Sequence, residues 1–168
     1  MDEERGAIYR RSGEGPATWA MGQLFEHLLT AAESESLVGL SVVTAPPDAA
    51  PPLHRHTKEA EAFFLLDGAI TYRAGDEVFR MDPGDFIYLP RGLPHAFRIT
   101  SSGPSRFLAL TAPGGLMHLY DEVGIPAAER RLPGSDGQPL STEVPRWLQL
   151  AGKYGIEVLG PPMPKEVA

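Results

Sequence analysis

The sequence contains no cysteine among its 168 residues. Disulfide bonds and thiolate metal sites are therefore excluded, so any bound metal must be held by imidazole nitrogen and carboxylate oxygen. No apolar run approaches the ~20 residues that a membrane-spanning helix needs. Residues 2–5 are all charged, and this segment lacks the apolar region of a signal peptide. We therefore expect a cytoplasmic protein that does not enter a membrane.

Basic residues are also few. Lysine and arginine together number 15 against 22 acidic residues, which gives a formal net charge of -7. Because no positive field is available to meet phosphates, a nucleic-acid partner is not expected. Hydrophobic residues make up 42% and charged residues 22% of the chain, a composition typical of one globular domain.

Glycine and proline are abundant, at 18 and 17 residues, which indicates many turns between short elements. The prolines of residues 46–52 exclude the interior of a helix or strand, so this segment is expected to be a loop. Short apolar stretches that recur about every 8 to 12 residues favour a β-sandwich or barrel. The expected strands are residues 18–30, 37–45, 62–66, 69–73, 78–81, 86–89, 95–99 and 106–111.

Turn chemistry supports these strand boundaries. Asp67-Gly68 is a strong hairpin signal. Residues 82–85, Asp-Pro-Gly-Asp, fit a type II turn, and residues 90–93 repeat that pattern.

The pattern changes after Pro113. We expect a short helix over residues 116–123, a loop over 125–140 and a second helix that ends at Gly155. Apolar residues at helical spacing mark the second helix: Val144, Trp147, Leu148, Ala151 and Tyr154. We interpret the chain as one domain, with a flexible arm (1–15), a β-barrel (16–113) and a helical C-terminal extension (114–168).

Three histidines and one glutamate form the candidate metal site. His54 and His56 are two residues apart, so they share one face of a strand. If the strands that carry Glu61 and His95 pair with that strand, the four groups converge at one end of an apolar interior. Such a set would hold one divalent ion (iron, manganese, nickel, cobalt or zinc) and leave one or two positions open.

Other titratable residues compete for this role. Glu59 has the same strand parity as Glu61 and is the rival ligand. Glu61 fits the spacing to the following hairpin turn better, so we expect Glu59 to face solvent or support the rim. His27 and His118 lie outside both segments and are expected not to be ligands.

These residues resemble the two motifs of the cupin family. The first, Gly-x5-His-x-His-x3,4-Glu-x6-Gly, has Asp48 in place of its opening glycine and then matches His54, His56, Glu61 and Gly68. The second, Gly-x5-Pro-x-Gly-x2-His-x3-Asn, matches Gly84, Pro90, Gly92 and His95, with Ile99 in place of the asparagine. The resemblance implies an all-β cupin barrel (a jelly roll) whose metal ligands are His54, His56, Glu61 and His95.

A looser resemblance concerns residues 112–116 and 154–162, which are similar to bacterial quercetin-dioxygenase-like cupins. It implies a metal-dependent oxygenase in which dioxygen attacks a small aromatic or enolic substrate and Glu61 accepts a proton. The expected pocket residues are Phe63, Tyr72, Phe97, Ile99 and Leu110.

Two other functional classes are compatible with the same barrel, because one fold hosts many chemistries. One is a metal-dependent isomerase, epimerase or lyase, and the other is a non-catalytic small-ligand-binding protein. We also expect a homodimer, formed where a long first strand lies at a sheet edge. Trp147 is interpreted as a packing anchor.

Overall fold

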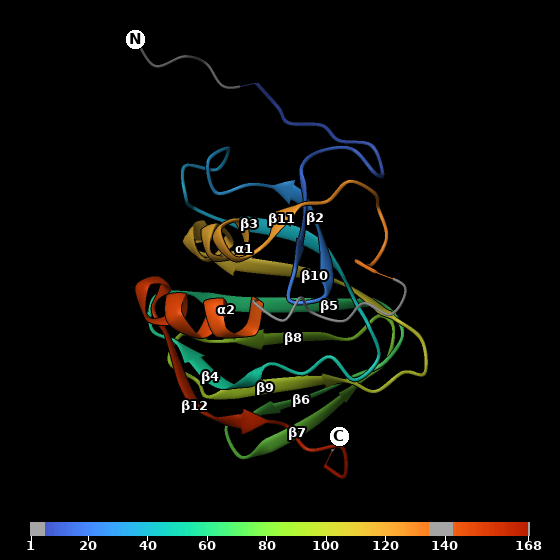
Figure 1. Ribbon diagram of the computed structural model, residues 1–168, viewed down its shortest axis with the longest axis vertical. Coiled ribbons are helices and arrows are strands. Elements are labelled where there is room, and N and C mark those ends of the chain that lie inside the picture. The colour runs from blue at the N-terminus through green and yellow to red at the C-terminus, as the bar shows by residue number, and fades with distance from the viewer. Residues whose placement is uncertain (1–5, 135–142, 168) are drawn as a thin grey trace.

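The computed structural model describes residues 6–134 and 143–167. Two antiparallel sheets face each other, with strand orders β11-β1-β2-β3-β10-β5-β8 and β12-β4-β9-β6-β7 (Figure 1). This arrangement confirms the predicted all-β jelly roll. The strands are β1 (Ala17–Ala20), β2 (Gln23–Leu29), β3 (Gly39–Ala45), β4 (Pro52–His56), β5 (Ala60–Asp67), β6 (Ile70–Ala74), β7 (Glu77–Met81), β8 (Phe86–Leu89), β9 (His95–Ile99), β10 (Ser105–Ala112), β11 (Ile125–Pro126) and β12 (Ile156–Pro162).

The core forms because alternate residues of each strand face the space between the sheets. In the larger sheet, Phe107 lies opposite Val43 on one side and Leu65 on the other. From the smaller sheet, Ile70, Tyr72 and Ile99 join this cluster. These side chains fill one end of the barrel, and the cavity extends from Val43 and Phe107 toward the other end.

That other end is lined by smaller residues. Ala109 lies opposite Ser41 and Phe63, and Thr111 lies opposite Gly39 and Glu61. Glycine, serine and alanine do not fill the width of a barrel, so space is left beside Glu61.

The prediction of one strand over residues 18–30 is wrong. β1 and β2 form a hairpin whose turn residues, Met21 and Gly22, have φ of 54° and 72°. Two successive positive φ angles define the type I′ turn, which suits the twist of a hairpin. β1 also pairs with β11, so the free edge that we expected to form a dimer is covered. The homodimer stays a prediction.

Turns with a left-handed glycine form at all three predicted places, but the hairpin predicted at Asp67-Gly68 is wrong, because β5 and β6 lie in different sheets and do not pair. Gly68, Gly84 and Gly92 have φ of 90°, 100° and 85°. In the turn before β8, the Asp85 amide donates to the Asp82 carbonyl at 3.0 Å.

Both predicted C-terminal helices form, as α1 (Met117–Val123), preceded by a 3-10 turn, η1 (Gly114–Leu116), and α2 (Glu143–Ala151), followed by η2 (Gly152–Tyr154). Gly155, with φ of 76°, ends the second helix as predicted. Leu119 and Val123 of α1 pack in one cluster with Trp147 and Ala151 of α2. Figure 1 shows both helices on the same side of the barrel.

The extension is not purely helical, however. β12 returns to the smaller sheet and pairs with β4, with Ile156 opposite His56 and Val158 opposite His54. The alternating apolar residues at 156 and 158 explain this strand. Within the predicted loop over residues 125–140, β11 forms at its start, and residues 135–140 lie outside the described part of the chain.

None of the helices in residues 6–134 and 143–167 is long and apolar enough to cross a membrane.

We predict that Gly68→Ala destabilises the protein more than Gly84→Ala. Both glycines have a positive φ, but a Cβ at Gly68 would lie 2.8 Å from Ser105 Cα, whereas one at Gly84 meets no atom within 4 Å. In urea unfolding, we expect Gly84→Ala to lower the free energy of unfolding by about 1 kcal/mol. Gly68→Ala should lower it by roughly a further 1–3 kcal/mol. Equal losses for the two variants would show that the contact with Ser105 is not limiting.

Candidate metal centre

Three strands bring the predicted ligands together. β4 carries His54 and His56, β5 carries Glu61, and β9 carries His95 directly opposite His54. All four residues are buried, and one ligand atom from each lies within 4.8 Å of the others. The predicted convergence of these groups is therefore present.

The distances fit a common divalent ion. Glu61 Oε2 lies 3.2 Å from His56 Nε2 and 3.1 Å from His95 Nε2. Two ligands bound at about 2.1 Å and at right angles would lie about 3.0 Å apart. The observed separations match this geometry, so the donor set could hold one metal ion.

Backbone carbonyls orient two of the imidazoles. His54 Nδ1 donates to the Pro52 carbonyl at 2.7 Å, and His95 Nδ1 donates to the Leu93 carbonyl at 2.9 Å. Because Nδ1 carries the proton in each ring, the Nε2 lone pair is available to a metal.

His56 is held differently. Within the described residues, neither of its ring nitrogens makes a hydrogen bond of good geometry, although the side chain is buried and Nε2 lies 3.2 Å from Glu61 Oε2. A buried polar atom without a partner is costly, and an ion bound at Nε2 would remove that cost. The unsatisfied imidazole is therefore a feature of this structure that fits a metal site.

Glu59 does not face solvent, so that part of its prediction is wrong. Its side chain is 5% exposed, and Oε2 lies 4.0 Å from His56 Nδ1. Glu59 lies outside the set of converging ligand atoms. Glu59 therefore lies on the Nδ1 side of the His56 ring, whereas Glu61 lies on the Nε2 side.

Burial and mutual charge set the protonation of the site. Burial, together with the neighbouring His95 and His56, lowers the pKa of His54 to about 4, so this imidazole is neutral at neutral pH. Burial would lower the pKa of His56, but the Glu61 carboxylate outweighs it and raises that pKa. The pKa of Glu61 is lowered, because contacts with His56 and His95 outweigh burial.

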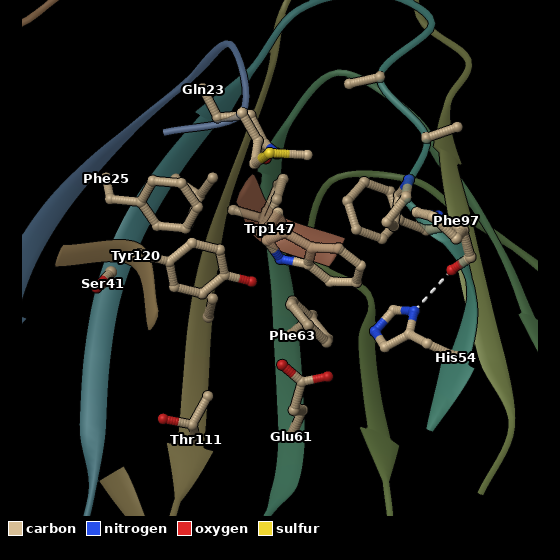
Figure 2. Close-up of a pocket in the computed structure, with 18 of the residues that line it drawn as sticks. Gln23, Phe25, Ser41, His54, Glu61, Phe63, Phe97, Thr111, Tyr120 and Trp147 are labelled. Carbon is tan, nitrogen blue, oxygen red and sulfur yellow. Dashed lines mark hydrogen bonds between the residues drawn. The ribbon is translucent and has the colours of Figure 1, made fainter. Parts of the chain in front are cut away.

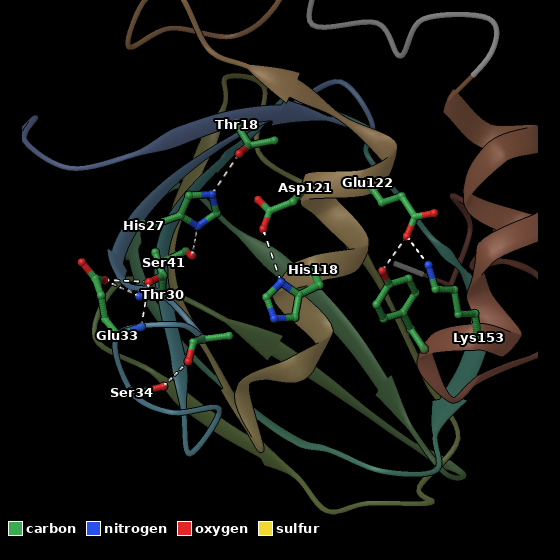
Figure 3. Close-up of polar contacts among 12 residues, drawn as sticks. Thr18, His27, Thr30, Glu33, Ser34, Ser41, His118, Asp121, Glu122 and Lys153 are labelled. Atoms are coloured by element: carbon green, nitrogen blue, oxygen red, sulfur yellow. Dashed lines mark hydrogen bonds and ion pairs between the residues drawn. The ribbon is translucent and has the colours of Figure 1, made fainter. Parts of the chain in front are cut away.

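The other two histidines are not part of this centre, as predicted. His27 is buried between Thr18 and Ser41, whose hydroxyls lie 3.0 Å from its two ring nitrogens (Figure 3). His118 is exposed on α1, 3.8 Å from Asp121.

The metal centre opens into a cavity of about 410 Å³, a size typical of small-molecule sites. Phe63 and Phe97 line it, as predicted (Figure 2). Tyr72 and Ile99 instead pack in the core and do not line the cavity. Leu110 is also outside the lining, because Ala109 and Thr111 occupy the inner face of β10.

The sequence analysis did not predict that two aromatic residues of the C-terminal extension line the pocket. Trp147 of α2 is more than a packing anchor, because it lines the cavity and its ring lies edge-on to His54, with centroids 6.1 Å apart. Tyr120 of α1 lines the cavity and stacks on Phe25. Met117 and Tyr120 are three residues apart on one helical face, which was a usable signal.

The loop of residues 46–52 forms another part of the cavity wall. Asp48, which stands where the cupin motif has glycine, has φ of 64°, a conformation that aspartate tolerates better than most residues. Its amide donates to the Ile99 carbonyl, and Ile99 in turn donates to the Ala49 carbonyl. Asp48 and Ile99, the two residues at which the sequence departs from the motifs, are therefore joined by a backbone hydrogen bond.

Comparison with known proteins decides the family. Residues 41–111, which include all four candidate ligands, match the family described as Cupin domain. Over these residues the chain carries a cupin domain. Quercetin 2,3-dioxygenase of Bacillus subtilis (strain 168) is 26% identical to this cupin over 143 residues. The alignment covers 85% of the cupin but only 42% of that relative.

Solved structures share the fold of this cupin. A predicted oxalate decarboxylase from Thermotoga maritima superposes with a TM-score of 0.56 and 21% identity, over 64% of the cupin and 99% of that chain. KdgF from Halomonas sp. superposes with a TM-score of 0.55 and 16% identity, over 65% of this cupin and 94% of that chain. The cupin domain of Schizosaccharomyces pombe Cnp3 superposes with a TM-score of 0.54 and 22% identity, over 69% of this cupin and 75% of that chain. At these identities the likeness concerns the fold alone.

We predict that cobalt(II) binding quenches the fluorescence of Trp147, because its ring lies beside His54. Trp19 lies at a different place, where its indole donates to the Arg131 carbonyl at 2.7 Å. Quenching should therefore persist in Trp19→Phe and disappear in Trp147→Phe.

We predict that His95→Ala weakens cobalt binding at least about 100-fold while the circular dichroism spectrum stays unchanged. Full cobalt occupancy in this variant would remove His95 from the ligand set.

We also predict that metal binding weakens as the pH falls. Because the pKa of His56 is raised above its usual value, this residue carries a proton in mildly acidic solution that the metal must displace, whereas His54, with a pKa of about 4, is already neutral there. Zinc binding near pH 6 should therefore release at least part of a proton per ion. Calorimetry in two buffers of different ionisation enthalpy measures this number, and equal apparent enthalpies in the two buffers would contradict the prediction.

Proposed function

We propose that this cupin is a metal-dependent oxygenase that acts on a small, uncharged aromatic or enolic substrate. The observation that carries the proposal is the pairing of a four-ligand centre with a largely apolar cavity. The relationship to a quercetin 2,3-dioxygenase gives additional support and suggests flavonol-like substrates.

The charge of the cavity favours this substrate class. Among the described residues, no lysine or arginine lines it, and its carboxylate-bearing residues are Asp48 and Glu61. A dicarboxylate, an acidic sugar or a phosphate ester would bring negative charge that no side chain there offsets. A neutral enol, which needs to lose only one proton at the metal, has no such penalty.

Phe63, Phe97 and Trp147 would form the dry walls around a flat ring. A divalent ion, when bound, would supply Lewis acidity for the enol oxygen and a binding position for dioxygen. Glu61 lies at the edge of the cavity (Figure 2) and could accept the enol proton. In a dioxygenase both oxygen atoms enter the product, so no external reductant is required.

The experiment is oxygen uptake by iron-, manganese-, nickel- and cobalt-loaded protein with a panel of flavonols, diketones and small enols, and with oxalate as the anionic control. We expect uptake with an aromatic enol, none with oxalate, and none with His95→Ala. Conversion of a substrate under argon would instead assign a redox-neutral isomerase or lyase. Tight binding of these compounds without turnover would assign a ligand-binding protein.

A further inference from the structure

We infer that Tyr120 binds the substrate by donating a hydrogen bond from its hydroxyl to a second, uncharged oxygen, while the first oxygen lies at the metal centre. The inference rests on the proposed function and narrows its substrate class. The substrate would carry an ionisable enol or phenol oxygen and, on the same rigid framework, a neutral acceptor such as a carbonyl.

Tyr120 is held in a fixed position inside the cavity. It comes from α1, outside the barrel, and its ring stacks on Phe25 with centroids 4.5 Å apart and an interplanar angle of 27°. Figure 2 shows its hydroxyl directed from this stack toward the middle of the cavity, on the side where Phe63 and Glu61 lie. A ring clamped in this way presents its hydroxyl without a loss of side-chain entropy on binding.

The hydroxyl of Tyr120 is not used by the protein itself. It makes no hydrogen bond to any residue in the described part of the chain. His27, by contrast, is held between two hydroxyls (Figure 3), and the Tyr154 hydroxyl donates to Glu122 at 2.6 Å. Tyr120 therefore offers an unused donor to the contents of the cavity.

The environment keeps this donor protonated. Burial raises the pKa of Tyr120, and the negative charge of Glu61 raises it further. The neutral phenol can donate to a carbonyl oxygen, whereas the negative charge of Glu61 disfavours a second anionic oxygen on the ligand. In a cavity with aromatic walls, a ligand without an acceptor at this place would leave the Tyr120 hydroxyl unpaired. The unpaired donor lowers the affinity for such a ligand, so the cavity discriminates against it.

The test uses Tyr120→Phe, which keeps the ring and its stack on Phe25 and removes only the hydroxyl. Cobalt-loaded protein is titrated under argon with 3-hydroxyflavone, which carries an enol and a neighbouring carbonyl, and binding is followed by absorbance. We expect dissociation constants about 3- to 10-fold higher for the variant, the size of one hydrogen bond. Cobalt affinity and the melting temperature should be unchanged. Tyr88→Phe is the matched control, because Tyr88 is 58% exposed on β8.

Azide, a small metal-binding anion with no second acceptor, separates the outcomes. The inference requires that azide bind equally well to the parent protein and to Tyr120→Phe while the flavonol binds the variant more weakly. Equal flavonol affinities would overturn the role of Tyr120 and leave the proposed function standing. If azide binds the parent protein but the flavonol does not, the proposed substrate class fails and the inference fails with it.

Discussion

The contact of one buried carboxylate with two imidazoles governs the rest of this structure. Glu61 lies within 3.2 Å of His56 and His95 in the barrel interior. An isolated ionised carboxylate there would be strongly destabilising, so its partners must be present in every folded molecule. That requirement constrains the register of β4, β5 and β9, because a slip of one residue would turn each of these side chains to the outer face. A divalent ion at the same place would replace two proton-dependent contacts with coordinate bonds.

The same strands explain why a cavity exists next to the site. Large side chains fill one end of the barrel, while Gly39, Ser41 and Ala109 leave room beside Glu61. The space is then enclosed by residues that are not part of the barrel motif: Tyr120 from α1 and Trp147 from α2. The barrel therefore supplies the ligands, and the extension supplies part of the wall that selects what reaches them. This division is consistent with a superfamily in which one barrel carries many activities.

The parts of the fold that follow local rules could be predicted from the sequence. Alternation located β3 and β5 to β10 within a few residues, whereas β4 was not among the expected strands. Glycine and proline fixed the turns at Gly84 and Gly92. The convergence of the four ligands followed from strand parity and motif spacing. The hairpin between β1 and β2 was missed because Met21 takes a left-handed conformation that its side chain gives no reason to expect.

What could not be predicted depends on contacts between distant segments. Phe63 and Ile99 are both apolar residues on strands, yet Phe63 lines the cavity and Ile99 packs in the core. Ile99 belongs to the cluster that fills one end of the barrel, and no local pattern encodes how far along the barrel a strand residue lies. β12 is a similar case, since its pairing with β4 places the end of the chain beside His54 and His56. Through that pairing, the orientation of two candidate metal ligands depends on residues about a hundred positions away, so metal affinity and docking of the extension should be thermodynamically coupled.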